Sequence, residues 1–231
     1  PLKGGTGVVL VVHDVTEVRR LESVRRDFVA NVSHELKTPL TSIRAYLETL
    51  LDGGGLTDEE NNVRFLKKIE LHVNRLNALI TDLLSLSRIE SGDAFSQRLR
   101  VNLNDLVLGS YQRLGPNAEQ KGHTMRVHVG SEPLHVVGDT EAFHQIFDNL
   151  IDNAIKYTEP GGSVDVSVYR EGKRVRVDVK DTGVGIPQED LPRIFERFYR
   201  VDKARSRELG GTGLGLSIVK HLVQSLEGEV Q

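Results

Sequence analysis

A histidine and a glutamate lie next to each other, just ahead of a proline, in the segment 31–40. Apolar residues recur every three or four positions around this segment, which is the period of one helix face. At about 100° per residue, His34 projects from the side opposite this apolar stripe, and Thr38 shares its face. Pro39 removes a backbone donor and is expected to bend the helix beside the imidazole, close to Glu35. These residues favour an exposed histidine nucleophile, although a surface histidine on a kinked coiled coil stays open from this segment alone.

Polar residues with helical spacing also occur in the segment 148–157. Asn149 and Asn153 stand one turn apart, and Lys156 follows on a neighbouring face. Amide oxygens can ligate a hard cation such as Mg²⁺, and a lysine can bind phosphate. The simpler interpretation is a set of polar residues flanking a core stripe.

Two glycine-containing segments have the composition of ligand-binding loops. The segment 181–187 follows a predicted strand, and its glycines Gly183 and Gly185 would let a ligand approach the backbone, while a buried Asp181 can accept a hydrogen bond from an exocyclic amine. The segment 210–217 opens a helix, where backbone amides form a site for phosphate. Its pattern is neither a Rossmann fingerprint nor a P-loop. A tight turn alone would need only one of the glycines in 181–187.

A basic segment joins these two glycine-containing segments. It runs from Arg193 to Arg200 and continues through Lys203, Arg205 and Arg207. Such a segment favours a mobile lid over anionic phosphates. A charge run of this kind is more often a solvated surface.

The N-terminal elements expected to carry these residues are two long helices. The first spans 17–52 and is broken by the glycines at 53–55. A capping box at Thr57 and Glu60 starts the second, which ends at Gly92. One such hairpin cannot cover both of its apolar stripes, so a second copy of the chain is expected to complete a four-helix bundle. The alternative is that the stripes pack on the C-terminal half of the same chain.

From residue 101 onward, the pattern mixes helices with alternating strands. We expect helices over 104–121, over 139–157 with Asp139 as the cap, and from the 210–217 segment to about 226. Strands are expected over 124–129, 134–137, 163–170 and 173–180, with another beginning at 228–230. The predicted fold class is α+β, a helical hairpin followed by an α/β sandwich with helices on one side of a sheet.

Composition excludes several classes of function. The formal net charge of −3 over 231 residues gives no electrostatic case for nucleic acid. The absence of cysteine excludes disulfides and thiolate metal sites, and is consistent with a reducing compartment. The apolar run at 8–12 is too short to cross a bilayer and is typical of the last strand of a preceding domain. We expect the chain to be a piece of a longer protein.

Together the motifs resemble, in order and over nearly the whole chain, the transmitter region of bacterial sensor histidine kinases. The phosphoacceptor box corresponds to 28–40, the N box to 148–157, the G1 box to 181–187, the F box to 194–199 and the G2 box to 211–215. The resemblance implies the end of a PAS-like domain and a linker at 1–16, and a HisKA-type dimerisation and phosphotransfer domain at 17–96. A GHKL-type ATP-binding domain, without its last strands, would follow at 97–231.

The resemblance also implies roles for the site residues. His34 would take the γ-phosphoryl group of ATP, Glu35 would act as the base, and Thr38 would orient a water that dephosphorylates a partner protein. Asn149 and Asn153 would hold Mg²⁺ on the phosphates, and Asp181 would recognise the adenine amine. The other residues implied in nucleotide binding are Lys156, Tyr157, Gly183, Gly185, Arg197, Arg200, Gly211, Thr212, Gly213, Leu214 and Gly215.

The implied partners are a second copy of the chain and the receiver domain of a response regulator. No nucleic acid is implied, and membrane contact is expected only through segments absent from this chain, as in the cytoplasmic portion of a membrane-anchored parent. Two alternatives stay open: a GHKL ATPase of the chaperone or mismatch-repair kind, which lacks a phosphorylatable histidine, and a degenerate kinase that only forms a scaffold. Pro39 would be a hinge for the exchange between ATP and partner at His34.

Overall fold

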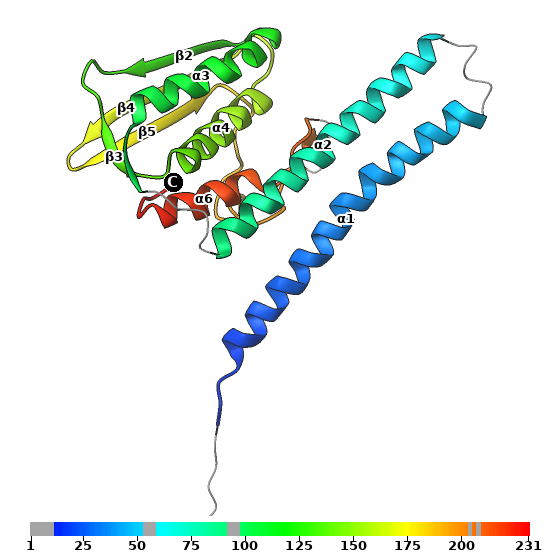
Figure 1. Cartoon of the computed structure of the whole chain (residues 1–231), viewed down its shortest axis with the longest axis horizontal. Helices are drawn as coiled ribbons and strands as arrows, with labels where there is room; N and C mark the ends of the chain where they lie inside the picture. Colours follow the sequence, from blue (N-terminus) through cyan, green and yellow to red (C-terminus); the bar gives the residue numbers. More distant parts are fainter. Residues whose placement is uncertain (1–11, 53–58, 92–97, 203–204, 207–208) are drawn as a thin grey trace, which may run out of the picture.

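Two long helices form a hairpin that extends from an α/β domain (Figure 1). The computed structural model describes residues 12–52, 59–91, 98–202, 205–206 and 209–231. Helix α1 (Thr16–Asp52) packs along α2 (Glu59–Ser91), within a residue or two of the predicted bounds. The predicted strand at 7–12 lies outside the described residues except for Val12, and the predicted glycine break and capping threonine lie outside them entirely.

Helix α1 continues without a break through Pro39, whose side chain is fully buried. The hydroxyl groups around the proline donate to main-chain carbonyls one turn earlier: Thr38 Oγ1 to His34 O at 3.0 Å, and Thr41 Oγ1 to Lys37 O at 2.9 Å. Such bonds add a second donor to carbonyls of the helix and often accompany bending. The proline and its hydroxyl neighbours therefore lie directly beside His34.

In the part of the chain that the structure describes, the α/β domain contains five strands and the helices α3, α4 and α6. In chain order they are β1 (Leu99–Asn102), α3 (Leu103–Gln120), β2 (Thr124–Val129), β3 (His135–Gly138), α4 (Thr140–Tyr157), β4 (Ser163–Glu171), β5 (Arg174–Asp181) and α6 (Gly215–Ser225). The helices and all but one of these strands match the prediction closely. This confirms the predicted fold class of a helical hairpin followed by an α/β sandwich.

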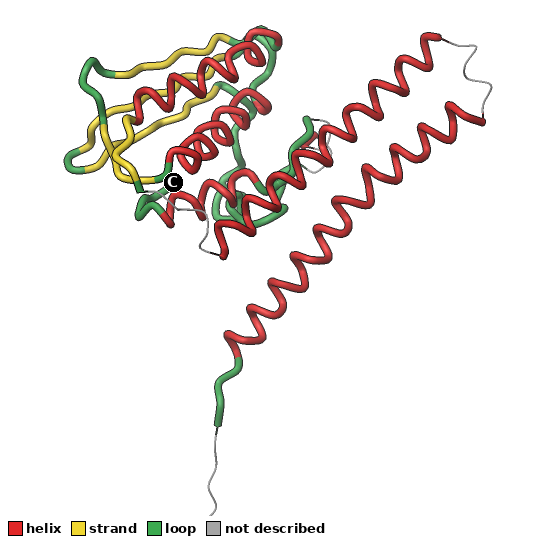
Figure 2. The backbone as a smooth tube through the Cα atoms, in the orientation of Figure 1, coloured by secondary structure: helices red, strands yellow, loops and turns green. Residues whose placement is uncertain are grey.

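The strands form two ladders. In the larger sheet β4 is central, parallel to β2 and antiparallel to β5, while β1 and β3 pair as a separate antiparallel ladder. Helices α3 and α4 lie over one face of the three-stranded sheet (Figure 2). Alternate residues Val164, Val166 and Val168 of β4 are buried, as the period of two requires for one covered face.

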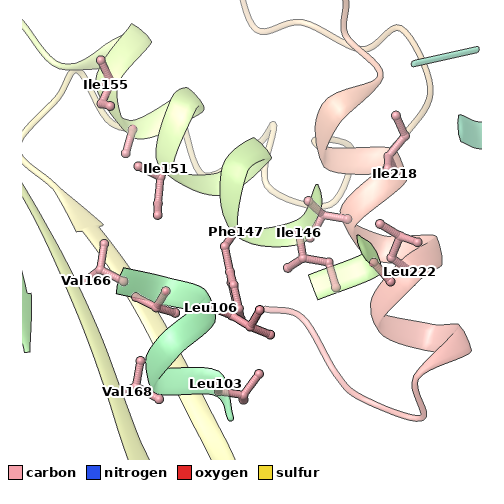
Figure 3. Close-up of a cluster of buried hydrophobic side chains, with 14 of the residues drawn as sticks. Leu103, Leu106, Ile146, Phe147, Ile151, Ile155, Val166, Val168, Ile218 and Leu222 are labelled. Atoms are coloured by element: carbon pink, nitrogen blue, oxygen red, sulfur yellow. The ribbon is translucent and has the colours of Figure 1, made fainter. Parts of the chain in front are cut away.

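The core of the domain is built by α3, α4, α6 and the covered face of β4. Figure 3 shows Ile151 and Ile155 of α4 with Val166 of β4, and Ile218 and Leu222 of α6 closing the other side. Helix α4 begins at a cap in which the Asp139 carboxylate accepts from two backbone amides of the first turn. The packing of this helix fixes the position of the polar residues on its other face.

Two predictions about strands were wrong. The sequence analysis missed β1, which is only four residues long and has two exposed residues, too short for a periodic signal. The strand expected at 228–230 is absent, since none of the described strands pairs with these residues. Instead, Glu227 follows helix α6 in the left-handed region (φ 61°), and Gly228 N donates to Val223 O at 2.8 Å. Val230 then packs on the core.

Candidate active site

His34 lies on the exposed side of α1, as its helical position predicted. Thr38, one turn later, is half-buried, and its hydroxyl is bound to the carbonyl of His34. A solvent-exposed imidazole is accessible to a phosphoryl donor or to a partner protein, and the threonine hydroxyl is beside it. The histidine and threonine therefore occupy one accessible patch of the hairpin.

Glu35 points away from solvent, into the contact between the hairpin and the α/β domain. Its side chain is 14% exposed, and its Oε2 accepts from Arg75 of α2 at 2.8 Å and from Arg200 at 3.0 Å. Charge-assisted hydrogen bonds of this length are among the stronger ones in proteins. The carboxylate expected to act as the base is thus held by two arginines, one from each part of the molecule.

The N-box residues project from α4 toward the glycine-rich loop at the start of α6. The amide nitrogen of Asn149 donates to Gln145 O at 2.8 Å, which assigns Oδ1 as the outward atom. A Cβ added to Gly215 would lie 2.6 Å from that oxygen and 3.9 Å from Asn153 Nδ2, so a side chain there would force the Asn149 amide to shift. Two amide groups with a free acceptor oxygen are suitable ligands for Mg²⁺. Lys156 is paired with Asp152 at 2.5 Å on the same helix.

The G1 turn is tied to the C-terminal end of α4. Asp181 Oδ1 accepts from Gly183 N at 2.8 Å, and a Cβ on Gly183 would lie only 2.4 Å from Tyr157 O. Gly185 follows in the left-handed region, with φ 69°. The prediction that Asp181 is buried was wrong: it is exposed, because it ends β5 at the edge of the sheet, and its carboxylate is available to accept from a purine amine.

The F-box and G2 loops contact each other just before the N-terminus of α6. Phe198, in the left-handed region with φ 62°, donates from its backbone to Gly213 O at 2.8 Å, and Arg200 donates to Thr212 O at 2.7 Å. Thr212 Oγ1 accepts from the backbone of buried Leu214, the residue before α6, at 3.2 Å. These contacts fix the G2 loop at the N-terminus of a helix, a position suited to phosphate.

Three glycines pack closely against the N box and the segment before the G2 loop. Gly183 lies against Tyr157, Gly211 against Ser206 and Gly215 against Asn149, so closely that an added Cβ would come within 2.6 Å of each. The Tyr157 hydroxyl donates to Ser206 Oγ at 3.0 Å, which links the N box to the segment before the G2 loop. An open cavity of about 580 Å³ lies between α2 and α4; Asn149 is in its wall, but none of these glycines is. The glycine-lined backbone and the amide oxygens of the N box suit a phosphate-bearing ligand with its cation.

Three residues expected to bind the nucleotide are instead engaged by acidic residues of the hairpin. Arg200 binds Glu35 of α1, while Arg197 binds Glu90 of α2 in a close ion pair. Thr212 Oγ1 donates to Asp82 Oδ2 of α2 at 2.6 Å.

An aromatic contact adds to these polar ones. The ring of Phe28 on α1 packs 5.8 Å from that of Phe198, and the Arg197 guanidinium lies 5.3 Å from the Phe28 centroid. The α/β domain is therefore docked on both helices through its F-box and G2 loops.

Burial raises the pKa of Asp82 above its usual value. Desolvation is the largest cause, partly offset by the Thr212 hydrogen bond and by the charge of Lys156, while nearby Asp152 raises the pKa further. Docking therefore makes this carboxyl easier to protonate than an exposed aspartate.

Comparison with known proteins identifies both parts of this arrangement. Residues 24–92 match the model of the His Kinase A (phospho-acceptor) domain, and residues 138–231 match that of the histidine kinase-, DNA gyrase B- and HSP90-like ATPases. The chain is the transmitter region of a sensor histidine kinase. The phosphoacceptor match removes the alternative of a chaperone-like ATPase without a phosphorylatable histidine.

Individual relatives support this assignment. The transmitter region is 41% identical to the sensor histidine kinase WalK of Bacillus subtilis over 97% of this chain, and 39% identical to the sensor-like histidine kinase SenX3 of Mycobacterium bovis over 96%. It spans 37% and 54% of their lengths, respectively. The structure of the Acinetobacter baumannii histidine kinase AdeS matches with a TM-score of 0.68 and 27% identity, covering 86% of this chain and 89% of that one.

The transmitter region brings some predicted residues together and separates others. Asn149, Asn153, Tyr157 and the three close-approach glycines gather around the C-terminal half of α4. Arg197, Arg200 and Thr212 turn toward the hairpin, and His34 is exposed on α1. In the described ranges, none of the helices is long and apolar enough to cross a membrane.

Sequence patterns did not indicate four hairpin residues at this contact. Phe28, Asp82 and Glu90 contact the F-box and G2 loops, and Arg75 binds Glu35. Arg75 and Asp82 lie beside the apolar stripe of α2 and outside it, so no spacing marked them.

Proposed function

We propose that this chain phosphorylates its own His34 with ATP and then transfers the phosphoryl group to an aspartate of a response regulator. The observation that supports this most directly is the placement of an exposed His34, adjacent to Glu35, on the same chain as a glycine-lined nucleotide site. The proposed domains are 17–96 for dimerisation and phosphotransfer and 97–231 for ATP binding, after the end of a PAS-like domain at 1–16.

In this reaction the neutral imidazole of His34 attacks the γ-phosphorus as the bond to the leaving ADP oxygen breaks. Glu35 accepts the proton from the other imidazole nitrogen, so positive charge does not accumulate on the ring. Asn149 and Asn153 would hold Mg²⁺, which when bound neutralises phosphate charge. Lys156 and Arg200 would meet phosphate oxygens, Tyr157 would pack near the adenine, and Asp181 would accept from its amine.

The docked arrangement is a resting state in this proposal. Arg200 is bound to the base and buried, with 4% of its side chain exposed, so it cannot also contact a phosphate. The ATP-binding domain must therefore release Glu35 before the phosphoryl group can reach His34. Release also clears the surface around His34 for the partner.

We further propose a homodimer with phosphatase activity toward the regulator. Apolar side chains remain exposed along both helices of the hairpin, although α2 also packs on α6: Val15, Val18, Val24, Val29, Leu40, Leu47, Leu51, Val63, Leu66, Leu71, Val73, Ile80 and Leu84. A second hairpin would cover such a surface in a four-helix bundle. Thr38, beside His34, would orient the water that dephosphorylates the regulator. The parent protein would be anchored in the membrane by segments outside this chain.

The deciding experiment is incubation with labelled ATP and Mg²⁺. We expect an acid-labile, base-stable phosphoprotein that His34→Gln abolishes. His128→Gln, an exposed histidine on β2, is the matched control and should label normally. Label retained in His34→Gln would refute the assignment.

A further inference from the structure

Arg75 and Glu35 form an ion pair within the hairpin itself. Arg75 projects from α2 and is nearly buried, with 8% of its side chain exposed, and its terminal nitrogen lies 2.8 Å from Oε2 of Glu35 on α1. The packing of α1 against α2 holds both residues in one unit. Because both residues belong to the hairpin, movement of the ATP-binding domain does not by itself separate them.

The second arginine on Glu35 belongs to the other unit. Arg200 lies in the segment before α6 and contacts both carboxylate oxygens, Oε2 at 3.0 Å and Oε1 at a longer 3.4 Å. Arg200 is also bound to Thr212 O at 2.7 Å, so it is held to the ATP-binding domain and moves with it. When the domain leaves its docked position, as the proposed function requires, Arg200 leaves Glu35 and Arg75 stays.

Once Arg200 has left, the two oxygens of the Glu35 carboxylate would have different partners. Oε2 remains bound to Arg75, whereas Oε1 loses its contact with Arg200 NH1. A carboxylate with one oxygen fixed by an arginine keeps a defined orientation, and its other oxygen can accept a proton. Without any arginine, a mostly buried carboxylate would be left without a charged partner.

We propose that Arg75 is a positioning residue for the phosphorylation of His34: it anchors Glu35 through Oε2 and thereby presents Oε1 to the imidazole N–H. The proton passes from the imidazole nitrogen to Oε1 as the nitrogen–phosphorus bond forms and ADP departs. Arg75 itself contacts neither ATP nor His34 in this step. The proposal rests on the proposed function of Glu35 as base.

The test is a double-mutant cycle on autophosphorylation, with kcat and KM for ATP measured separately. Arg75→Gln should lower kcat by up to roughly 100-fold, the size associated with misplacing a reacting group, with KM changed by less than about twofold. Arg75→Lys should restore part of kcat, since it keeps the charge but not the planar donor geometry. In a Glu35→Gln background, Arg75→Gln should add less than about twofold, because its effect passes through the carboxylate.

Arg44→Gln is the matched control, because Arg44 pairs with Glu48 on the exposed side of α1 and should leave kcat unchanged. Thermal midpoints are measured for every variant, and if Arg75→Gln is unfolded the cycle is run with Arg75→Lys. An equal loss of kcat in the Glu35 and Glu35→Gln backgrounds, or full kcat in Arg75→Gln, overturns the inference. A Glu35→Gln variant as fast as the unmodified chain would instead overturn the role of Glu35 in the proposed function.

Discussion

The hydroxyl of Thr212 lies 2.6 Å from Asp82 Oδ2 and joins the glycine-rich loop to helix α2. The same hydroxyl accepts from Leu214 N at the start of α6, so one side chain connects a helix of the hairpin to the helix that follows the loop. The Asp82 carboxyl is buried at this contact, and the burial raises the pKa of Asp82. Protonation of Asp82 therefore favours docking.

Asp82→Asn should stabilise the docked arrangement at neutral pH, because it keeps an acceptor for Thr212 and removes the buried charge. Since the pKa of Asp82 is raised in the docked state, its contribution is complete below about pH 4 and is lost as pH rises through the raised pKa. The advantage of the variant should thus grow from pH 4 to pH 8. A gain of ~1 kcal/mol would raise Tm by about 2–4 °C in a chain of this size.

Thermal unfolding of both forms across that pH range checks this prediction. Asp178→Asn is a control of opposite sign, because hydrogen bonds from Tyr169 and Arg176 lower the pKa of Asp178. Its contribution is present above the usual aspartate pKa and is lost as pH falls, so that variant should be destabilised at neutral pH. A pH-independent difference for Asp82→Asn would contradict the assignment of the buried charge.

Glu90→Gln should increase the affinity for an ATP analogue. Arg197 is bound to Glu90 in the docked state, so release of the arginine and binding of nucleotide phosphates are linked. Partly exposed ion pairs contribute roughly 0.2–1 kcal/mol, which corresponds to at most about a fivefold change in Kd. Calorimetric titration measures it, and Glu48→Gln, paired with exposed Arg44, should leave Kd unchanged. Equal Kd values for both variants would show that docking and nucleotide binding are independent.

Gly183→Ala should abolish or strongly weaken nucleotide binding. The added Cβ would lie 2.4 Å from Tyr157 O, a backbone atom at the end of α4 that cannot move without shifting the N box. Gly130→Ala, directly after β2 and with no atom within 4 Å of an added Cβ, is the control and should leave nucleotide affinity unchanged. Unchanged nucleotide affinity in Gly183→Ala would place the ligand away from this turn.

Thr38→Ala should retain autophosphorylation while losing dephosphorylation of the regulator. The hydroxyl lies beside His34, and its loss leaves the imidazole, Glu35 and the nucleotide site intact. Assays of both activities with the same regulator check the prediction, with Thr49→Ala, another helix-bonded threonine of α1, as control. Equal phosphatase rates in Thr38→Ala and the unmodified chain would refute the role.

Leu66→Glu should weaken the homodimer without unfolding the chain. Leu66 is 55% exposed on α2, so a charge there costs little in the single chain but would be buried against a second hairpin. Sedimentation at micromolar concentration should give a dimer for the unmodified chain and for Leu191→Glu, a leucine of the α/β domain that is 46% exposed. A monomer for the unmodified chain would contradict the four-helix bundle.

Much of the fold follows from local sequence patterns. The heptad repeats of α1 and α2, the cap at Asp139 and the alternation of β4 are local, so they predicted elements whose bounds agree to within a few residues. The β1–β3 ladder joins segments far apart in sequence through four short pairs, and no local pattern reports such pairing.

The candidate site was predictable as a set of residues but not as an arrangement. The spacing of Asn149, Gly183 and Gly215 indicated a nucleotide site, and the structure brings these residues to one end of α4. The engagement of Arg200 by Glu35 could not be predicted, because a difference of a few kcal/mol between docked and released domains is not encoded in spacing.

The docking contacts have one consequence for signal transmission along the hairpin. Phe28 and Glu35 belong to α1, whereas Asp82 and Glu90 belong to α2, and the F-box and G2 loops together bind all four at once. If one helix slid or rotated against the other, the two residues on α1 would move relative to the two on α2. The F-box and G2 loops could then contact only one of the two pairs. Docking of the ATP-binding domain therefore depends on the alignment of α1 with α2, and misalignment of the two helices is enough to weaken it.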